Sequence, residues 1–196
     1  MTKIETANQL YGRAIGSMIL AGFGGIWLLL SFYTKEMLNA ATFFYIAAGV
    51  LALLAGSAKL MRTASCYPRI AGDRAHNRAF GWINALQWIA IFIVVNILTS
   101  LHLDAYSISA IACIVGLHFF PLAKLFNNGM HYMTGAAMVA WSAVTALFAP
   151  LDRMQGDAAM GAGVILWTSA AITLGISLMR SRRRSLISPS VTTETV

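Results

Sequence analysis

The fold is decided by residues Phe80–Leu101, which read FGWINALQWIAIFIVVNILTSL and contain no charged side chain. A helix rises 1.5 Å per residue, so about 20 residues cross a hydrocarbon core of about 30 Å. Within lipid the backbone must satisfy its own hydrogen bonds, and an uncharged stretch of this length is therefore helical. Phe80–Leu101 predicts a transmembrane helix.

Five more apolar stretches lie on either side of it along the chain. They are Gly12–Tyr33, Ala40–Leu60, Tyr106–Leu125, Tyr132–Pro150 and Ala158–Met179. With 58% apolar and 11% charged residues, the chain is too apolar for an ordinary water-soluble domain. We therefore expect an all-α polytopic membrane protein with six transmembrane helices. Its expected parts are a cytoplasmic N-terminal segment (1–11), a six-helix transmembrane domain (12–179) and a basic, Ser/Thr-rich cytoplasmic tail (180–196) that is disordered from Ser181 onward.

The positive charges predict the orientation of these helices. If all six stretches cross the membrane, 12 of the 14 Lys and Arg residues fall on one side of it. Only Lys35 and Arg153 fall on the other side, in the short connections Thr34–Asn39 and Leu151–Asp157. Because cytoplasmic loops are enriched in Lys and Arg, both termini are expected in the cytoplasm.

Four arginines follow the last apolar stretch, namely Arg180, Arg182, Arg183 and Arg184. We expect them to contact anionic lipid headgroups, an attraction worth about 1 kcal/mol for each residue near the surface. The net charge of +7 could also attract nucleic acid, but it is confined to segments beside the membrane. Membrane lipids are therefore the expected partners, and nucleic acid is not.

Polar side chains inside the apolar stretches mark a candidate site. His118 lies six residues before Lys124, which marks the cytoplasmic end of its stretch. On the preceding stretch, Asn84 and Gln87 are three residues apart, so they share one helix face and reach a similar depth. Pro121 frees a backbone carbonyl one turn upstream, beside the imidazole. These residues are expected to meet near the cytoplasmic face.

Two interpretations of this polar cluster stay open. In the first, His118, Asn84 and Gln87 line a wet cleft and contact a small-molecule ligand, with the imidazole as proton acceptor or ligand contact. In the second, they form interhelical hydrogen bonds worth about 0.6 kcal/mol each. The first predicts a small-solute permease or channel, and the second predicts a structural or lipid-binding membrane protein.

Other chemistries find little support in the sequence. No Asp or Glu lies within the six stretches, which argues against a carboxylate relay or an acid–base pair. His118 is the one deep histidine, whereas a bis-histidine haem needs two that face each other. Cys66 and Cys113 form no CxxC motif. An enzyme, a metal site and a cofactor are therefore not expected.

Small residues recur at a spacing of four, as in Gly12 and Gly16 or Ala159 and Gly163. This spacing lets helices approach closely in lipid. Packing within one chain and a homo-oligomer interface both fit this pattern.

Two segments resemble a known family. NALQW (Asn84–Trp88) and IVGLHFFPLAKLF (Ile114–Phe126) are similar to motifs of a family of small bacterial multi-spanning membrane proteins of unknown function. The similarity covers about Gly81–Gly135, and the motif residues are Asn84, Gln87, Trp88, Gly116, His118, Phe119, Pro121 and Lys124. The resemblance implies a bacterial inner membrane and no particular activity. The candidate solute-binding residues are thus His118, Asn84, Gln87, Trp88, Pro121 and Lys124.

Overall fold

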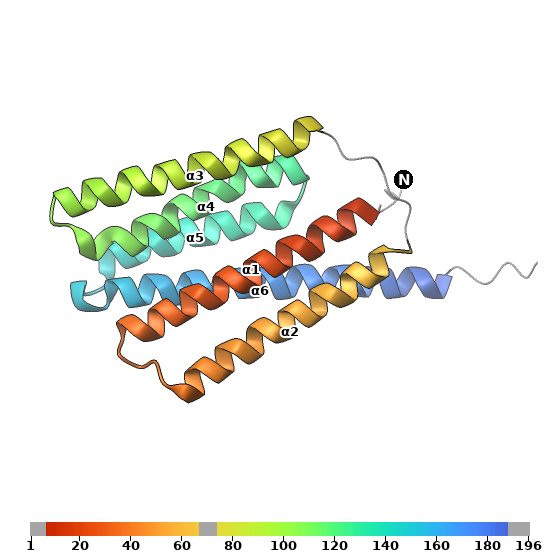
Figure 1. The fold of residues 1–196 in the computed structure, drawn as a ribbon, viewed down its shortest axis with the longest axis horizontal. Coiled ribbons are helices and arrows are strands. Elements are labelled where there is room, and N and C mark those ends of the chain that lie inside the picture. The colour runs from red at the N-terminus through yellow and green to blue at the C-terminus, as the bar shows by residue number, and fades with distance from the viewer. Residues whose placement is uncertain (1–6, 67–73, 188–196) are drawn as a thin grey trace, which may run out of the picture.

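The computed structural model describes residues 7–66 and 74–187, and every regular element within them is a helix. The elements are α1 (Ala7–Thr34), α2 (Ala40–Ala64), α3 (Arg74–Ser100), the 3-10 helix η1 (Asp104–Tyr106), α4 (Ser107–Phe126), α5 (Gly129–Phe148) and α6 (Leu151–Ile187) (Figure 1). The predicted all-α class is confirmed. Residues 1–6, 67–73 and 188–196, which include part of the expected cytoplasmic loop and tail, lie outside the described residues.

Five helical segments of the described chain are long and apolar enough to cross a membrane. They are Ala7–Thr34, Ala40–Ala64, Asn77–Ser100, Asp104–Phe126 and Leu151–Ser181. The remaining predicted stretch corresponds to the 20-residue helix α5, which is not one of these five segments. The five segments support a multi-pass membrane protein, and the sixth predicted span is not confirmed.

The beginning of α6 differs from the sequence prediction. The segment Leu151–Asp157 was expected as a connection, but it is helical. The backbone N–H groups of Arg153 and Met154 donate to the carbonyl oxygen of Pro150 at 3.0 and 2.9 Å. Asp152 lies in the first turn, where a carboxylate interacts favourably with the positive end of the helix dipole. The expected connection is thus wrong, and the chain turns into α6 directly at Pro150.

The end of α6 is also later than expected. The helix continues through residue 187, so residues 181–187 are not the disordered start of a tail. Arg and Leu favour helix, and no proline follows Pro150 until Pro189. Arginines near a helix C-terminus also interact favourably with the negative end of the helix dipole. The structure describes the backbone of residues 182–187 without their side chains, so the expected headgroup contacts of Arg182, Arg183 and Arg184 remain a prediction.

The most extensive helix contact joins α1 to α6, the first helix to the last. Here Gly24 and Gly163 allow the two backbones to approach closely, because a Cβ on Gly163 would lie 2.9 Å from the carbonyl oxygen of Gly24. Trp167 of α6 lies over Gly24 of α1 and Gly49 of α2, and its indole N–H donates to the carbonyl oxygen of Ala21 at 3.0 Å. Trp167 therefore joins three helices.

A second close contact joins α4 to α5. A Cβ on Gly135 would lie 2.6 Å from the carbonyl oxygen of Gly116, and a Cβ on Gly116 would lie 3.0 Å from the carbonyl oxygen of Gly135. The two glycines thus allow α4 and α5 to pack backbone against backbone.

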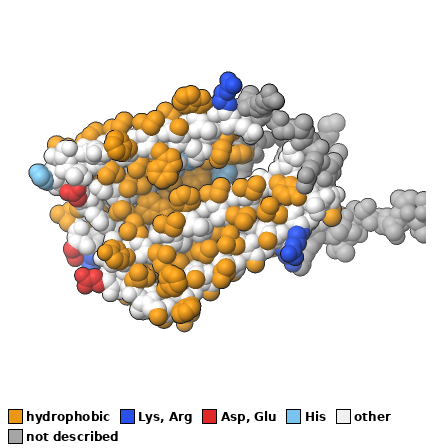
Figure 2. All heavy atoms as spheres, viewed as in Figure 1, with side chains coloured by type: hydrophobic (Ala, Val, Ile, Leu, Met, Phe, Trp, Pro, Cys, Tyr) orange, Lys and Arg blue, Asp and Glu red, His pale blue; other side chains and the backbone are white. Residues whose placement is uncertain are grey.

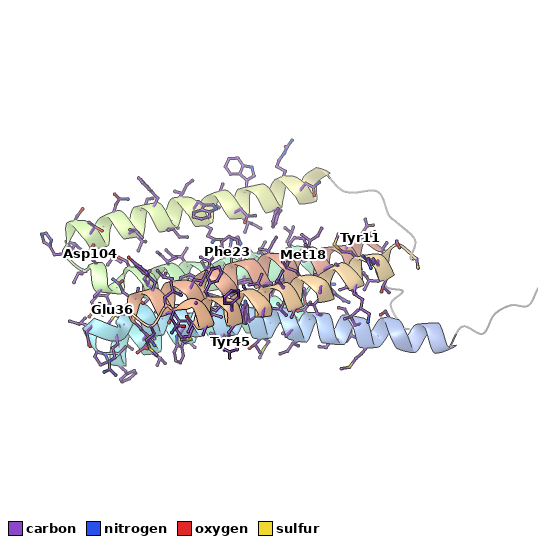
Figure 3. The ribbon with its side chains drawn as sticks, turned by 60° about the horizontal axis from the view of Figure 1, so that its bottom comes forward. Tyr11, Met18, Phe23, Glu36, Tyr45 and Asp104 are labelled. Carbon is purple, nitrogen blue, oxygen red and sulfur yellow. The ribbon has the colours of Figure 1, made fainter. Side chains whose placement is uncertain are left out.

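Helix α3 is the least embedded element. It packs mainly on α4, and none of the residues in its most apolar window is buried within the bundle. Figures 1 and 3 both show it on the outside, away from α2. Lipid rather than protein is therefore expected to surround most of α3.

Charged side chains separate toward the two ends of the bundle. The start of α1, the start of α3 and the end of α6 lie at the same end of the bundle (Figure 1). Glu36 and Asp104 lie at the other end, away from Tyr11 (Figure 3). In Figure 2 the acidic side chains in view gather at that same end.

The two cations at the acidic end both lie against carboxylates. Lys35 Nζ is 2.7 Å from Asp157 Oδ1, and Arg153 Nε is 3.8 Å from Asp152 Oδ2. Because these carboxylates offset the two positive charges, the difference in charge between the ends is greater than a count of Lys and Arg suggests.

Candidate functional site

His118 lies on α4 at its contact with α3. Its imidazole approaches the backbone of Ile83, the residue before Asn84. The Nδ1 atom of His118 is buried and has no hydrogen-bond partner among the described residues. Leaving a buried polar atom unpaired costs about 1–3 kcal/mol. A polar solute that reached Nδ1 would gain the hydrogen bond that the described side chains do not provide.

Asn84 does not form the interhelical bond that one interpretation expected. Its side-chain amide donates to the carbonyl oxygen of Phe80, one turn earlier on α3, at 2.8 Å. Both Asn84 and Gln87 are half-buried, which agrees with their shared helix face. Asn84 thus lies at a similar depth to His118, but its side-chain amide is hydrogen-bonded within its own helix.

The other three candidate residues lie on the outside of the bundle. Trp88 is 60% exposed, and Pro121 and Lys124 are also exposed. Pro121 lies inside α4, as the sequence indicates. The structure therefore places His118, Asn84 and Gln87 nearer to the helix contact than Trp88, Pro121 and Lys124.

His131 joins this region, although the sequence did not predict it. Its ring centroid is 5.7 Å from that of Phe119, which in turn is 6.2 Å from that of His118. Phe126 lies 6.2 Å from His131 and 5.8 Å from Phe80 of α3. We call these five side chains the ring cluster; it links α3, α4 and α5 near the basic end of the bundle.

In the sequence, His131 falls within the region of family resemblance, Gly81–Gly135, and directly before the predicted stretch Tyr132–Pro150. The expected boundary placed it in or at a cytoplasmic loop. In the structure α5 begins at Gly129, so His131 is helical and its ring turns toward α4. The direction of that side chain depends on the turn geometry, which composition does not reveal.

A hollow opens on the face of the molecule seen in Figure 2, between α3 and α1, and a histidine side chain is visible within it. Apolar side chains surround the hollow in this view.

Hydroxyl pairs hold the helices together deeper in the bundle. Ser109 of α4 and Thr145 of α5 lie 3.1 Å apart, and Thr134 of α5 and Ser169 of α6 lie 2.7 Å apart. Such interhelical bonds stabilise membrane bundles by about 0.6 kcal/mol each. These hydroxyl pairs hold neighbouring helices together, which is the role that the second interpretation gave to His118, Asn84 and Gln87.

No group of three or more His, Cys, Asp or Glu side chains within residues 7–66 and 74–187 is arranged to hold a metal ion. Cys66 and Cys113 are both free thiols. The chemistry of the candidate site is thus that of an imidazole and amides.

No protein-family model matches the chain, and neither the curated proteins nor the solved structures include a match. The fold and its apolar helices define the general class, a helical integral membrane protein.

Proposed function

We propose that the chain is a six-span protein of the bacterial inner membrane with both termini in the cytoplasm, and that it belongs to the family that its NALQW and GLHFFPLA segments resemble. The charge separation between the two ends supports the orientation. The ion pair between Lys35 and Asp157 supports this orientation further. Lys35 is one of the two cations at the proposed periplasmic end, and the carboxylate of Asp157 neutralises its charge.

The orientation predicts the behaviour of reporter fusions. Alkaline phosphatase inserted at Met37, between α1 and α2, is expected to be active because that turn faces the periplasm. A green fluorescent protein fused after Val196 is expected to fluoresce in the cytoplasm. Inactive phosphatase together with a dark C-terminal fusion would show the reverse orientation.

Within that class we propose a small-solute permease or channel whose cytoplasmic entrance includes His118, Asn84 and Gln87. The observation that supports it most is the buried Nδ1 of His118 without a partner among the described residues. Ionisable side chains inside a bilayer are costly, which favours a functional role for an imidazole that has one nitrogen unpaired. The imidazole would donate to or accept from the solute, and the half-buried Gln87 would supply an amide.

The loose attachment of α3 supports the same proposal. Transport requires an element that moves, and α3 packs mainly on one neighbour. A small displacement of α3 from α4 would widen access to His118, because the imidazole lies at that contact.

The alternative is a structural or lipid-binding membrane protein. The bond of Asn84 to its own helix and the hydroxyl pairs between α4, α5 and α6 favour it. In this case the region around His118 would be dry and would admit no water-soluble reagent.

Cysteine labelling separates the two functions. In a chain with Cys66→Ser and Cys113→Ala, we compare His118→Cys with Leu117→Cys, whose native side chain is 53% exposed on the outside of α4. A charged methanethiosulfonate reagent reacts with hydrated thiolates and poorly with thiols in lipid. The permease predicts labelling of His118→Cys from the cytoplasmic side at least tenfold faster than labelling of Leu117→Cys. Equal slow rates would support the structural alternative.

The same variants allow a transport test. Proteoliposomes are placed in isosmotic glycerol, urea or glycine, and their swelling is followed by light scattering. The permease predicts swelling faster than lipid alone with at least one solute, slowed by modification at residue 118 but not at residue 117. Swelling that is insensitive to modification would contradict a path beside His118.

A further inference from the structure

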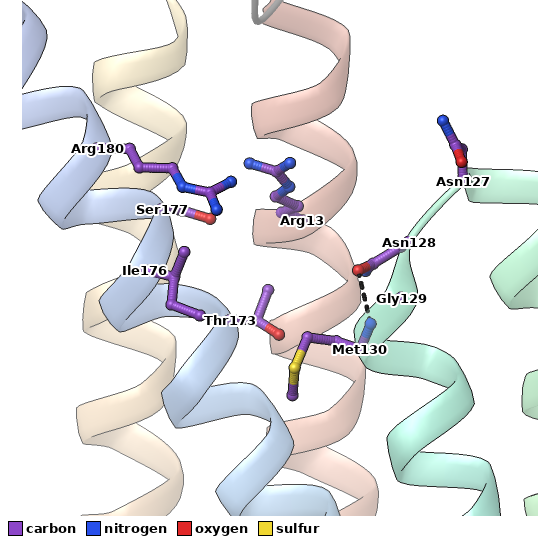
Figure 4. Close-up of a pocket in the computed structure, with 9 residues that line it drawn as sticks. All are labelled: Arg13, Asn127, Asn128, Gly129, Met130, Thr173, Ile176, Ser177 and Arg180. Atoms are coloured by element: carbon purple, nitrogen blue, oxygen red, sulfur yellow. Dashed lines mark hydrogen bonds between the residues drawn. The ribbon is translucent and has the colours of Figure 1, made fainter. Parts of the chain in front are cut away.

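A polar pocket of about 290 Å³ lies between α1, α6 and the turn from α4 to α5, whose residues 127–130 connect Phe126 and His131 of the ring cluster. Its lining residues are Arg13, Asn127, Asn128, Gly129, Met130, Thr173, Ile176, Ser177 and Arg180. Figure 4 shows the Arg13 and Arg180 side chains extending from opposite helices toward one another. Two of these nine lining residues are arginines, and none of the nine is acidic.

The turn from α4 to α5 adds to this charge. Asn127 adopts a left-handed conformation with φ of 47°, which asparagine tolerates better than most residues, and it ends α4. Asn128 then begins α5, and its Oδ1 accepts from the backbone N–H of Met130 at 3.2 Å. The positive end of the α5 dipole therefore faces the pocket that the two arginines line.

An apolar groove continues from the pocket along the outside of the bundle. This second hollow, of about 360 Å³, lies between α5 and α6 and shares Met130 with the pocket. Its other lining residues are Met133, Thr134, Ala137, Val164, Ile165, Thr168, Ser169 and Ile172. From Met130 to Ala137 the groove follows α5 for about 10 Å toward the membrane interior.

We propose that the pocket and the groove together bind one anionic phospholipid of the cytoplasmic leaflet. The phosphate would lie between Arg13 and Arg180, and one acyl chain would lie in the groove between α5 and α6. Guanidinium groups form strong, charge-assisted hydrogen bonds with phosphate.

The geometry favours a lipid over a free anion. A free phosphate needs only the polar pocket, whereas the adjoining groove is lined mostly by apolar side chains and runs along the helices. This site shares no residue with the proposed solute entrance, so it can exist whether or not the protein transports a solute.

The first test compares two pairs of cations at the same end of the bundle. The double variant Arg13→Gln/Arg180→Gln removes the pocket charge, and Lys59→Gln/Arg62→Gln removes two exposed charges on α2 outside the pocket. Binding of phosphatidylglycerol to the purified protein is followed by its thermal stabilisation, with phosphatidylcholine as the neutral reference. We expect the apparent Kd for phosphatidylglycerol to rise at least tenfold in the first variant and less than twofold in the second. Equal losses would show attraction to general surface charge and overturn the proposal.

The second test concerns the groove and does not depend on the arginines. Ala137→Trp fills the groove, whereas Ala171→Trp adds the same side chain at an exposed position of α6 outside it. We expect Ala137→Trp to weaken phosphatidylglycerol binding at least fivefold and Ala171→Trp to leave it unchanged. Equal binding by the two variants would overturn the placement of the acyl chain.

A third arm identifies the source of the phosphate. Glycerol 3-phosphate carries the same anionic group without acyl chains, and we expect millimolar glycerol 3-phosphate to stabilise the protein far less than micromolar phosphatidylglycerol. Equal stabilisation at equal concentration would show a site for a free phosphate compound and overturn the lipid.

Discussion

Replacement of Gly135 by alanine is expected to destabilise the bundle by about 3 kcal/mol, the upper end of what overpacking usually costs. The added Cβ would lie 2.6 Å from the carbonyl oxygen of Gly116 and 3.1 Å from the Cβ of Phe119. The first of these is a backbone atom in the middle of α4, so a change of rotamer cannot relieve the contact. The two helices must separate, which weakens the hydroxyl pair between Ser109 and Thr145 as well.

The measurement is the melting temperature of the purified protein, followed by tryptophan fluorescence. Gly22→Ala is the matched control, because a Cβ on Gly22 meets nothing within 4 Å. Alanine favours helix over glycine by up to about 1 kcal/mol, so the control is expected to melt at the same temperature or higher. If Gly135→Ala melted together with Gly22→Ala, the close approach of α4 and α5 would be wrong.

Replacement of Trp167 by alanine is expected to cost about 3–5 kcal/mol, as large-to-small substitutions at packed aromatic positions do. The indole lies over the two glycines Gly24 and Gly49 and forms a hydrogen bond to Ala21. Its removal leaves a cavity where α1, α2 and α6 meet, and these backbones cannot close it without a rearrangement. Trp167→Phe keeps most of the ring and should lose about 1 kcal/mol through the missing hydrogen bond.

Trp88→Ala is the matched control for this substitution. Trp88 is 60% exposed on α3, so its truncation removes few protein contacts and should change the melting temperature little. Comparable losses for Trp88→Ala and Trp167→Ala would show that α3 is packed more tightly than the structure describes.

The helices could be predicted from the sequence because the length and polarity of each stretch decide them. The errors concern α6, where Leu151–Asp157 and residues 181–187 look polar enough for loops but are helical. A polar residue outside the apolar core of a membrane does not end a helix; only the local backbone chemistry does. The first residues of α6 bond to Pro150, and no proline follows until Pro189.

The candidate site was predictable only in part. Counting residues from the basic end placed His118 and Asn84 at a similar depth, and the imidazole does approach the backbone beside Asn84. The hydrogen-bond partner of Asn84 and the position of His131 depend on rotamers and on the turn after α4. Spacing along one helix carries no information on either.

The sequence named the small residues but not what they contact. Gly24 and Gly163 face each other within the chain, whereas Gly12, Gly16 and Gly175 have no neighbouring atom within 4 Å of an added Cβ. Ala159 and Gly163 have the same spacing of four as Gly12 and Gly16. Only the tertiary arrangement distinguishes a glycine that allows packing from one that does not.

The contact between α1 and α6 has a consequence for biosynthesis. The first helix enters the membrane before its principal partner α6 is translated, so Gly24, which packs against Gly163 and Trp167 of α6, faces lipid until then. The contact between α1 and α6 can form only after α6 has been synthesised and inserted. A product truncated before α6 would leave Gly24 exposed to lipid.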